Sequence, residues 1–146
     1  MDSLARLERS AMVLWNCLSE GKGQHREARA LQEWLIDLLE GLYPGESCHL
    51  HKLNAANYAG CAIHSVLLGE EAQAKVYLRR AKEAAMTFDT APSYDAGKMR
   101  FYHGRSATAH DDFGSTAMEG IGLTLEMQEE PVRTRALALW KQVQAE

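Results

Sequence analysis

Apolar residues recur every three or four positions along almost the whole chain, and this spacing constrains the fold more than any other feature. Near the start of the chain, one stripe of a helix would carry Leu4, Leu7, Ala11, Leu14 and Leu18. No segment of the sequence shows the convincing alternation of apolar and polar residues that a half-buried strand requires. The sequence therefore predicts an all-α protein.

Glycines, prolines and capping residues divide the chain into seven predicted helices. Pro44 and Pro92 follow the second and fourth helices, because proline cannot continue a helix interior. Thr116 and Glu119 have the spacing of a capping box, which marks the start of the sixth helix. Pro131 fits the first turn of the seventh. The predicted helices cover about residues 3–20, 31–42, 47–67, 74–88, 93–106, 116–125 and 131–144.

The chain also contains a repeat of about 43 residues. A shift of 43 positions aligns Trp15 with Tyr58 and Phe101. Three further columns coincide under the same shift: Leu31 with Ala74 and Ala117, Leu35 with Leu78 and Ile121, and Leu38 with Ala81 and Thr124. We interpret residues 1–146 as a single domain of three units, about 3–44, 47–92 and 93–131, followed by a capping helix at about 131–144.

The middle unit resembles the tetratricopeptide-repeat (TPR) family. That family has a large aromatic residue early in the first helix of a unit, followed after sixteen, twenty and twenty-three positions by a small, a bulky and a second small residue. Tyr58, Ala74, Leu78 and Ala81 have these separations, while the outer units keep the spacing with looser chemistry. The resemblance implies about three stacked antiparallel helical hairpins in a TPR-like α-α superhelix, in which each hairpin buries its apolar face by stacking on another.

The resemblance also implies a function, because stacks of this kind bind peptides or proteins on a concave face formed by the first helix of each hairpin. The positions that correspond to this groove are Val13, Asn16, Ala59, Ile63, Val66, Met99, Tyr102, Ser106 and Ala109. They are mostly apolar. The family's carboxylate-binding variant uses Lys, Arg and Asn at such places, and here only Asn16 is of that type. An apolar peptide or a second copy of the chain is therefore the expected ligand.

Composition excludes several other classes of protein. The formal net charge of −4 and the isoelectric point near 5.9 argue against generic binding of nucleic acid, which needs a basic surface. No apolar run approaches the length of a membrane span, and the first residues lack the apolar core of a signal peptide. The three cysteines, Cys17, Cys48 and Cys61, do not resemble a disulfide framework. We therefore expect a cytoplasmic protein without a membrane or nucleic-acid partner.

Two groups of residues are of types that bind zinc, but neither has the paired spacing of a structural site. The first group is Cys48, His49 and His51, and the second is Cys61 with His64. On a helix the last two share a face, and we expect a packed thiol and a hydrogen-bonded imidazole there. The sequence therefore predicts no metal at these positions and no cofactor.

A third histidine pair leaves an alternative open. His103 and His110 lie seven positions apart and precede Asp111 and Asp112, which could form half of a metal site in a helical bundle or a solvated helix end. No phosphate-binding loop, nucleophile elbow or metalloprotease motif is present. We interpret the chain as a non-enzymatic interaction module. The alternatives are a structural homodimer without a further ligand and a small metal- or ligand-dependent helical enzyme.

Charges are segregated in the second half of the chain. Residues 75–105 contain seven Lys and Arg residues against three acids, whereas residues 106–131 contain six acids and no Lys or Arg. The basic stretch could be a docking face for an acidic partner. Alternatively, it could pair within the chain with Asp111, Asp112, Glu119 and Glu126.

Overall fold

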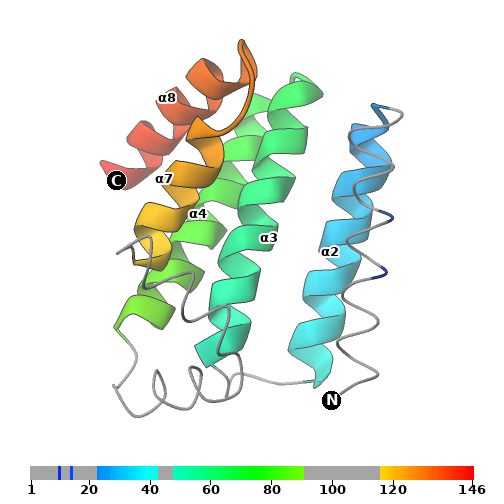
Figure 1. Cartoon of the computed structure of the whole chain (residues 1–146), viewed down its shortest axis with the longest axis vertical. Coiled ribbons are helices and arrows are strands. Elements are labelled where there is room, and N and C mark those ends of the chain that lie inside the picture. Colours follow the sequence, from blue (N-terminus) through cyan, green and yellow to red (C-terminus); the bar gives the residue numbers. More distant parts are fainter. Residues whose placement is uncertain (1–9, 11–13, 15–22, 43–47, 91–115) are drawn as a thin grey trace.

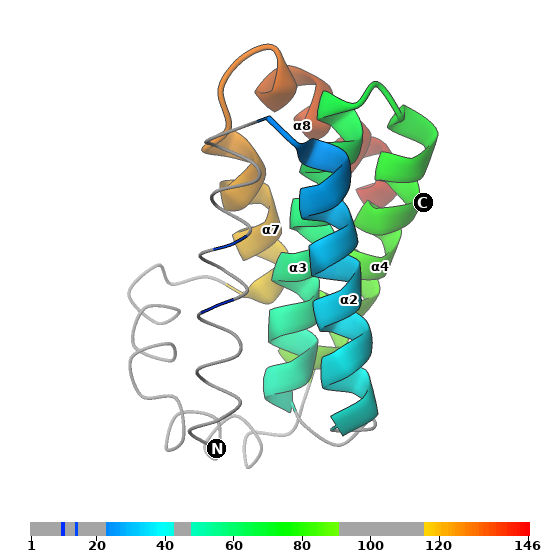
Figure 2. The same cartoon turned by 90° about the vertical axis from the view of Figure 1, so that its right-hand side faces the viewer.

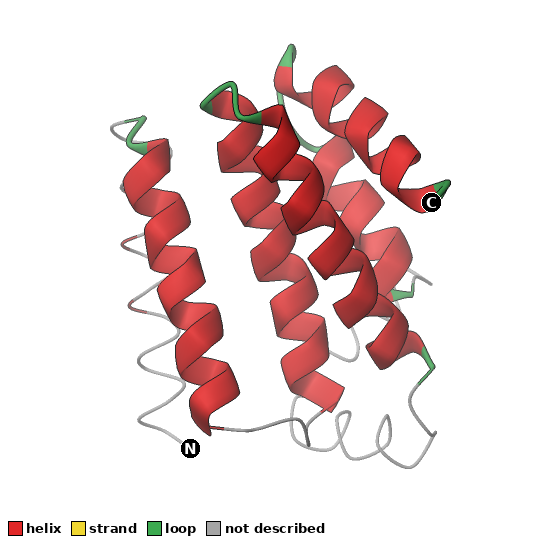
Figure 3. Cartoon of the chain, turned by 180° about the vertical axis from the view of Figure 1, so that it is seen from behind, coloured by secondary structure: helices red, strands yellow, loops and turns green. Residues whose placement is uncertain are grey.

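The computed structural model describes residues 23–42, 48–90 and 116–146, together with residues 10 and 14 (Figure 1). Its helices are α2 (His25–Leu42), α3 (Cys48–Leu67), α4 (Glu71–Asp89), α7 (Ala117–Glu126) and α8 (Val132–Gln144). No strand occurs in the described ranges (Figure 3). The prediction of an all-α protein is thereby confirmed. None of the helices described is both long and apolar enough to cross a membrane.

Each predicted helix that the structure describes is present, although α2 begins at His25, six residues before the predicted range of 31–42. The second, third, fourth, sixth and seventh predicted helices correspond to α2, α3, α4, α7 and α8. Of the first, residues 10 and 14 are described and both are helical, while the fifth lies outside the described residues. The Thr116 hydroxyl oxygen accepts a hydrogen bond from the Glu119 N–H at 3.1 Å, so the predicted N-cap of α7 is confirmed. Pro131 directly precedes α8, at its N-cap position.

The hairpin formed by α3 and α4 is the centre of the described structure. Gly69 makes the tight turn between the two helices, with a positive φ of 79° that an L side chain rarely adopts. The N–H groups of Gly69 and Glu70 bond to the carbonyls of Val66 and Ser65, which closes the end of α3. On one side of this hairpin lie α7 and α8, and on the other side α2 lies alongside α3 (Figures 1 and 2).

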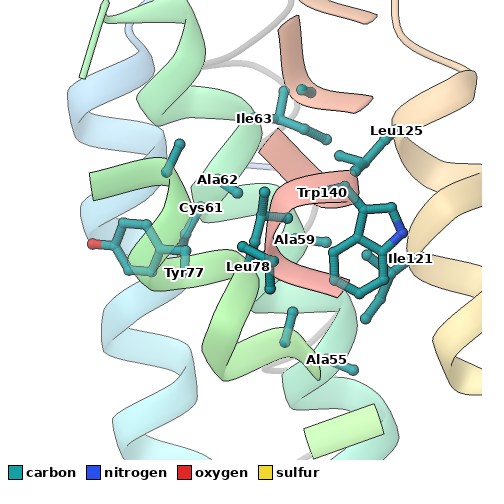
Figure 4. Packing of buried hydrophobic residues seen from close by; sticks show 14 of the residues in the cluster. Ala55, Ala59, Cys61, Ala62, Ile63, Tyr77, Leu78, Ile121, Leu125 and Trp140 are labelled. Atoms are coloured by element: carbon teal, nitrogen blue, oxygen red, sulfur yellow. The ribbon is translucent and has the colours of Figure 1, made fainter. Parts of the chain in front are cut away.

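The apolar core fills the space between α3, α4, α7 and α8. Trp140 of α8 lies beside Ile121 and Leu125 of α7, and both helices face the side of α3 that carries Ile63 (Figure 4). Among the α2 side chains that the structure describes, Ile36 alone belongs to this cluster, whereas Ala28, Leu35 and Leu39 are buried outside it. Helix α2 therefore contributes little to this apolar core, which α3, α4, α7 and α8 build.

Small residues of α4 lie where the repeat alignment expects close helix contacts. Ala74 and Ala81 are completely buried, as is Leu78 between them. Replacing Ala81 with leucine should overpack this contact and lower the free energy of unfolding by about 1 to 3 kcal/mol, because a dense core cannot absorb the extra methylenes. Urea denaturation would measure the loss, with Glu83→Leu on the exposed side of α4 as the control. Equal stabilities for the two variants would contradict tight packing at Ala81.

Asp89, the last residue of α4, fixes the start of α7. Its two carboxylate oxygens accept hydrogen bonds from the N–H groups of Ala117 at 2.7 Å and Met118 at 3.0 Å. These N–H groups have no acceptor within α7 itself, and the positive end of the helix dipole favours a carboxylate there. The contact joins residues 28 positions apart and holds the N-terminus of α7 against the C-terminus of α4.

We expect Asp89→Ala to lower the free energy of unfolding by roughly 0.5 to 2 kcal/mol, the range seen when helix N-terminal caps are removed. Asp89→Asn keeps one acceptor oxygen and should lose less. Thermal unfolding of both variants, compared with Glu83→Ala on the same helix, tests the contact. A wild-type midpoint for Asp89→Ala would show that Asp89 does not hold α7.

Candidate functional site

Between α2 and the α3–α4 hairpin lies a group of polar and ionisable side chains that contact one another. On α2, one face is buried through Ala28, Leu35 and Leu39. The adjoining face meets α3 and carries polar side chains at helical spacing, at residues 25, 29, 32 and 33. We call the contact made by this face the polar seam. It consists of His25, Arg29, Gln32, Glu33, Gly60, Cys61, His64, Ser65, Glu70 and Tyr77.

A pair of histidines lies near one end of the seam. The Nδ1 atoms of His25 and His64 are 3.1 Å apart, and the two rings stack with centroids 5.2 Å apart and planes inclined by 29°. His64 is only 2% exposed. Burial, followed by the proximity of His25 and Arg29, lowers the pKa of His64 from 6.5 to about 4. At neutral pH the His64 ring is therefore uncharged, and a hydrogen bond between the rings joins one N–H to one lone pair.

Arg29 ties α2 to the end of α3 and to the following turn. Its guanidinium donates to the Ser65 hydroxyl at 3.0 Å and to the Glu70 carboxylate at 2.8 Å. The Arg29 side chain is 13% exposed, so this ion pair is partly shielded from water. Arg26 approaches the same carboxylate at 4.0 Å but is well exposed. Glu70 therefore balances the one largely buried cation of the polar seam.

The side chains of Ser65 and Cys61 are buried and contact other groups of the chain. The Ser65 hydroxyl donates to the Cys61 carbonyl at 2.9 Å while accepting from Arg29. The Cys61 sulfur lies 4.0 Å from the Arg29 carbonyl and is completely buried. Burial, with a further contribution from Glu33, raises the pKa of the Cys61 thiol to about 12. The predicted packed thiol and hydrogen-bonded imidazole at Cys61 and His64 are both confirmed, and the thiol is held in its unreactive form.

Further along the seam, the helices approach closely. A Cβ atom on Gly60 would come within 2.2 Å of the Gln32 side-chain nitrogen, so glycine is what allows Gln32 to lie here. Among the residues that the structure describes, none provides a hydrogen-bond partner for the buried Gln32 side-chain oxygen. Tyr77 of α4, which is 3% exposed, donates its hydroxyl proton to Glu33.

The seam does not have the composition of a metal site. Within the ranges that the structure describes, no group of three or more His, Cys, Asp or Glu side chains could hold a metal ion. The Arg29 guanidinium beside His64 would also repel a cation there. The side chains of Cys48, His49 and His51 lie outside the described residues, as do His103 and His110.

The predicted groove residues fall into two groups. Ala59, Ile63 and Val66 are 1%, 7% and 1% exposed and belong to the chain's own core cluster, so they do not line a free surface. The other six lie outside the described residues: Val13, Asn16, Met99, Tyr102, Ser106 and Ala109. The groove as a whole thus stays a prediction.

Three basic residues of α4 have described partners, two of them in α8 or just after it and one on α3. The Arg79 guanidinium forms a bidentate ion pair with the Glu146 carboxylate, with hydrogen bonds of 2.7 and 2.8 Å. The Lys82 ammonium donates to the Val143 carbonyl at 3.1 Å. Arg80 lies over the Tyr58 ring, 6.0 Å from its centroid. The expected pairing within the chain therefore occurs for Arg79, but with an acid that the sequence did not indicate.

Comparisons with known proteins add no relative to this description. No family model matches the chain, and no curated protein or solved structure is significantly similar to it. The likeness to tetratricopeptide repeats therefore rests on the chain's own residues.

Proposed function

We propose that the chain is an interaction module of stacked, TPR-like helical hairpins that binds a protein or peptide. The α3–α4 hairpin supports this most directly, because Ala74, Leu78 and Ala81 are buried within it at the spacing of the repeat. Tyr58, the aromatic residue of the same unit, is half-buried against the core. Helices flank the hairpin on both sides, as neighbouring units of a stack would.

The binding surface is better sought among exposed apolar side chains than at the buried residues Ala59, Ile63 and Val66. Trp34 on α2 is the strongest candidate. It is 48% exposed, and Leu31 and Leu38, one turn away on either side, are only partly buried. The apolar stripe predicted for this helix is thus wider than the face that the chain itself covers. Tryptophan is the residue type most enriched among binding hot spots, since it buries a large area at small entropic cost.

A site-specific photo-crosslinker tests the proposal. Benzoylphenylalanine would replace Trp34 in one chain and Arg133, a similarly exposed residue of α8, in the matched control. The chains would be irradiated in cells of the native host. We expect one dominant heavier product that forms from position 34 and is absent from position 133. Equal product patterns from both positions would contradict a binding surface at Trp34. A product with the mass of two chains would favour the structural homodimer.

Trp34→Ala should weaken the captured interaction by about 2 kcal/mol, or roughly thirtyfold in dissociation constant, with little change in thermal stability. Isothermal titration and thermal unfolding on the same sample would measure both quantities. A variant that unfolds early but binds normally while folded would assign Trp34 to the fold and not to the partner surface.

A further inference from the structure

The exposed side of α2 has an apolar part and an acidic part. The apolar part is Trp34 with the partly buried Leu31 and Leu38, one turn away on either side. Beside it, three exposed acids recur at intervals of four and three residues, which places them along one line of the helix surface. We call these the acid row: Glu33, Asp37 and Glu40. Asp37 is also three residues from Trp34, so the acid row borders the exposed tryptophan.

The acid row is positioned by the α3–α4 hairpin, but its charges are not balanced there. Glu33 accepts a hydrogen bond from the Tyr77 hydroxyl, and Glu40 accepts one from the Asn54 side-chain amide at 3.4 Å. Both donors are neutral groups. Among the side chains that the structure describes, no Lys, Arg or His forms an ion pair with any of the three acids. Their negative charges are therefore available to a ligand.

The bases of α2 lie at its other end. Arg26 and Arg29 both approach the Glu70 carboxylate, at 4.0 and 2.8 Å. Residues 30–42, which include Trp34 and the acid row, contain no Lys or Arg. This half of the helix therefore presents an apolar side chain in a negative environment.

The negative potential of the acid row extends as far as α3. Burial raises the pKa of the Tyr58 hydroxyl, and Glu40 and Asp37 raise it further, while Arg80 opposes them. Arg80 itself lies over the Tyr58 ring, 6.0 Å from its centroid. A surface of this kind attracts cationic ligands and repels anionic ones.

We propose that Trp34 and the acid row together bind a basic amphipathic helix of a partner protein. The inference rests on the proposed function, whose binding surface and partner class it specifies. Glu33 and Glu40 are seven residues apart, or about 10 Å along α2. A partner helix with Lys or Arg at the same spacing pairs with the whole row while its apolar face covers Trp34. The charges set the orientation and the rate of encounter, and Trp34 supplies the buried area.

A second copy of the chain fits this surface poorly. In a two-fold symmetric dimer through α2, the same patch lies on both sides of the interface, so each copy brings its own acid row. Like charges placed together across an interface are unfavourable. A partner of opposite charge avoids this repulsion.

Fluorescence anisotropy with the full chain and three labelled peptides tests the inference. Each peptide is an amphipathic helix of about 14 residues, or four turns, with leucine on one face and lysine, glutamine or glutamate on the other. We expect the lysine peptide to bind roughly tenfold more tightly than the glutamine peptide, and the glutamate peptide to bind more weakly still. Trp34→Ala and Asp37→Lys should each weaken binding of the lysine peptide on the order of tenfold. Glu126→Lys, the same charge change at an exposed acid of α7, should alter it less than about twofold.

The outcomes separate this inference from the proposed function. Equal losses for Asp37→Lys and Glu126→Lys would mean attraction to the overall negative charge and would overturn the inference, as would a lysine peptide that binds no better than the glutamate peptide. A loss with Trp34→Ala but none with Asp37→Lys would overturn the inference and leave the Trp34 surface standing. A loss with Asp37→Lys but none with Trp34→Ala would remove Trp34 from the surface, and the binding site given under the proposed function would fail.

Two further measurements complete the test. Thermal unfolding shows whether each variant is folded, and Asp37→Asn, which should weaken binding about threefold, replaces Asp37→Lys if the charge reversal prevents folding. Sedimentation velocity on the chain alone covers the other occupant. A dimer that Trp34→Ala dissociates would place a second copy on this surface and overturn the inference.

Discussion

Replacing Trp140 with alanine is expected to lower the free energy of unfolding by about 3 to 5 kcal/mol, the usual loss for a buried aromatic side chain. Trp140 is 4% exposed and lies beside Ile121 and Leu125 of α7, so its removal would leave a cavity between α8 and the rest of the core (Figure 4). Its indole nitrogen lies 3.6 Å from where a Cβ on Gly122 would be, so the ring packs close to the α7 backbone at that glycine.

Guanidinium denaturation followed by circular dichroism would measure this loss. The matched control is Lys141→Ala, the next residue on α8, which is exposed and should change stability by no more than about 0.5 kcal/mol. A loss below about 1 kcal/mol for Trp140→Ala would show that α8 is not a packed part of the core. The expectation that the last helix caps the stack would then fail as well.

The second large effect is a loss of stability on acidification. The pKa of His64 is about 4 in the folded chain and near 6.5 when the ring is in water. The unfolded chain therefore binds the proton more readily, and stability is full above pH 6.5 and falls until the pH reaches about 4. Between pH 7.5 and pH 5.0 we expect a loss on the order of 2 kcal/mol from this group.

Urea unfolding at several pH values would reveal the loss as a falling midpoint. His64→Gln removes the titrating ring, and its midpoint should depend much less on pH over the same interval. Carboxyl groups change the pH dependence of stability chiefly below pH 5. Both chains contain the same carboxyl groups, so any remaining effect should be alike in the two. The same pH dependence in wild type and His64→Gln would contradict a buried neutral imidazole at this position.

The sequence predicted the helices well because their signals are local. The spacing of Leu78, Ala81 and Ala85 along α4 identifies a buried helical face without knowledge of its partner, and all three are fully buried. The Thr116 cap was equally accessible, since its acceptor oxygen and the Glu119 N–H are three residues apart. Asp89, which also caps α7, could not be found in this way, because its contact spans 28 residues.

The polar seam was not predicted, although part of its signal lies in the sequence. His25, Arg29, Gln32 and Ile36 recur at intervals of four, three and four on α2, which places them on one helix face. Attention to apolar residues alone assigns that face to solvent. Which hairpin residues meet it depends on how α2 packs on α3, and this is a tertiary property. The apolar stripe predicted for α2 also included Trp34, which the fold leaves exposed. Apolar spacing alone could not show which part of the stripe would be covered.

Glu146 illustrates the same limit for charged residues. The acids near the basic stretch in sequence, Glu119 and Glu126, lie on α7, whereas Arg79 pairs with Glu146, which follows the end of α8 and lies 67 residues away. Surface ion pairs contribute little to stability and form wherever packing brings the side chains together. Their partners follow from the fold and cannot be read from charge segregation.

Native-state hydrogen exchange, resolved to individual helices at neutral pH, would test most directly whether α2 is attached separately from the apolar core. We expect amides of α3, α4 and α8 to exchange only through global unfolding, whereas those near the N-terminal end of α2 should open at a distinctly lower free energy. Opening of α2 should also become easier from pH 7.5 to pH 5.0, with the intrinsic exchange rate taken into account. Amides of α2 that open at the same free energy as those of α4 at both pH values would show that one cooperative core holds all these helices.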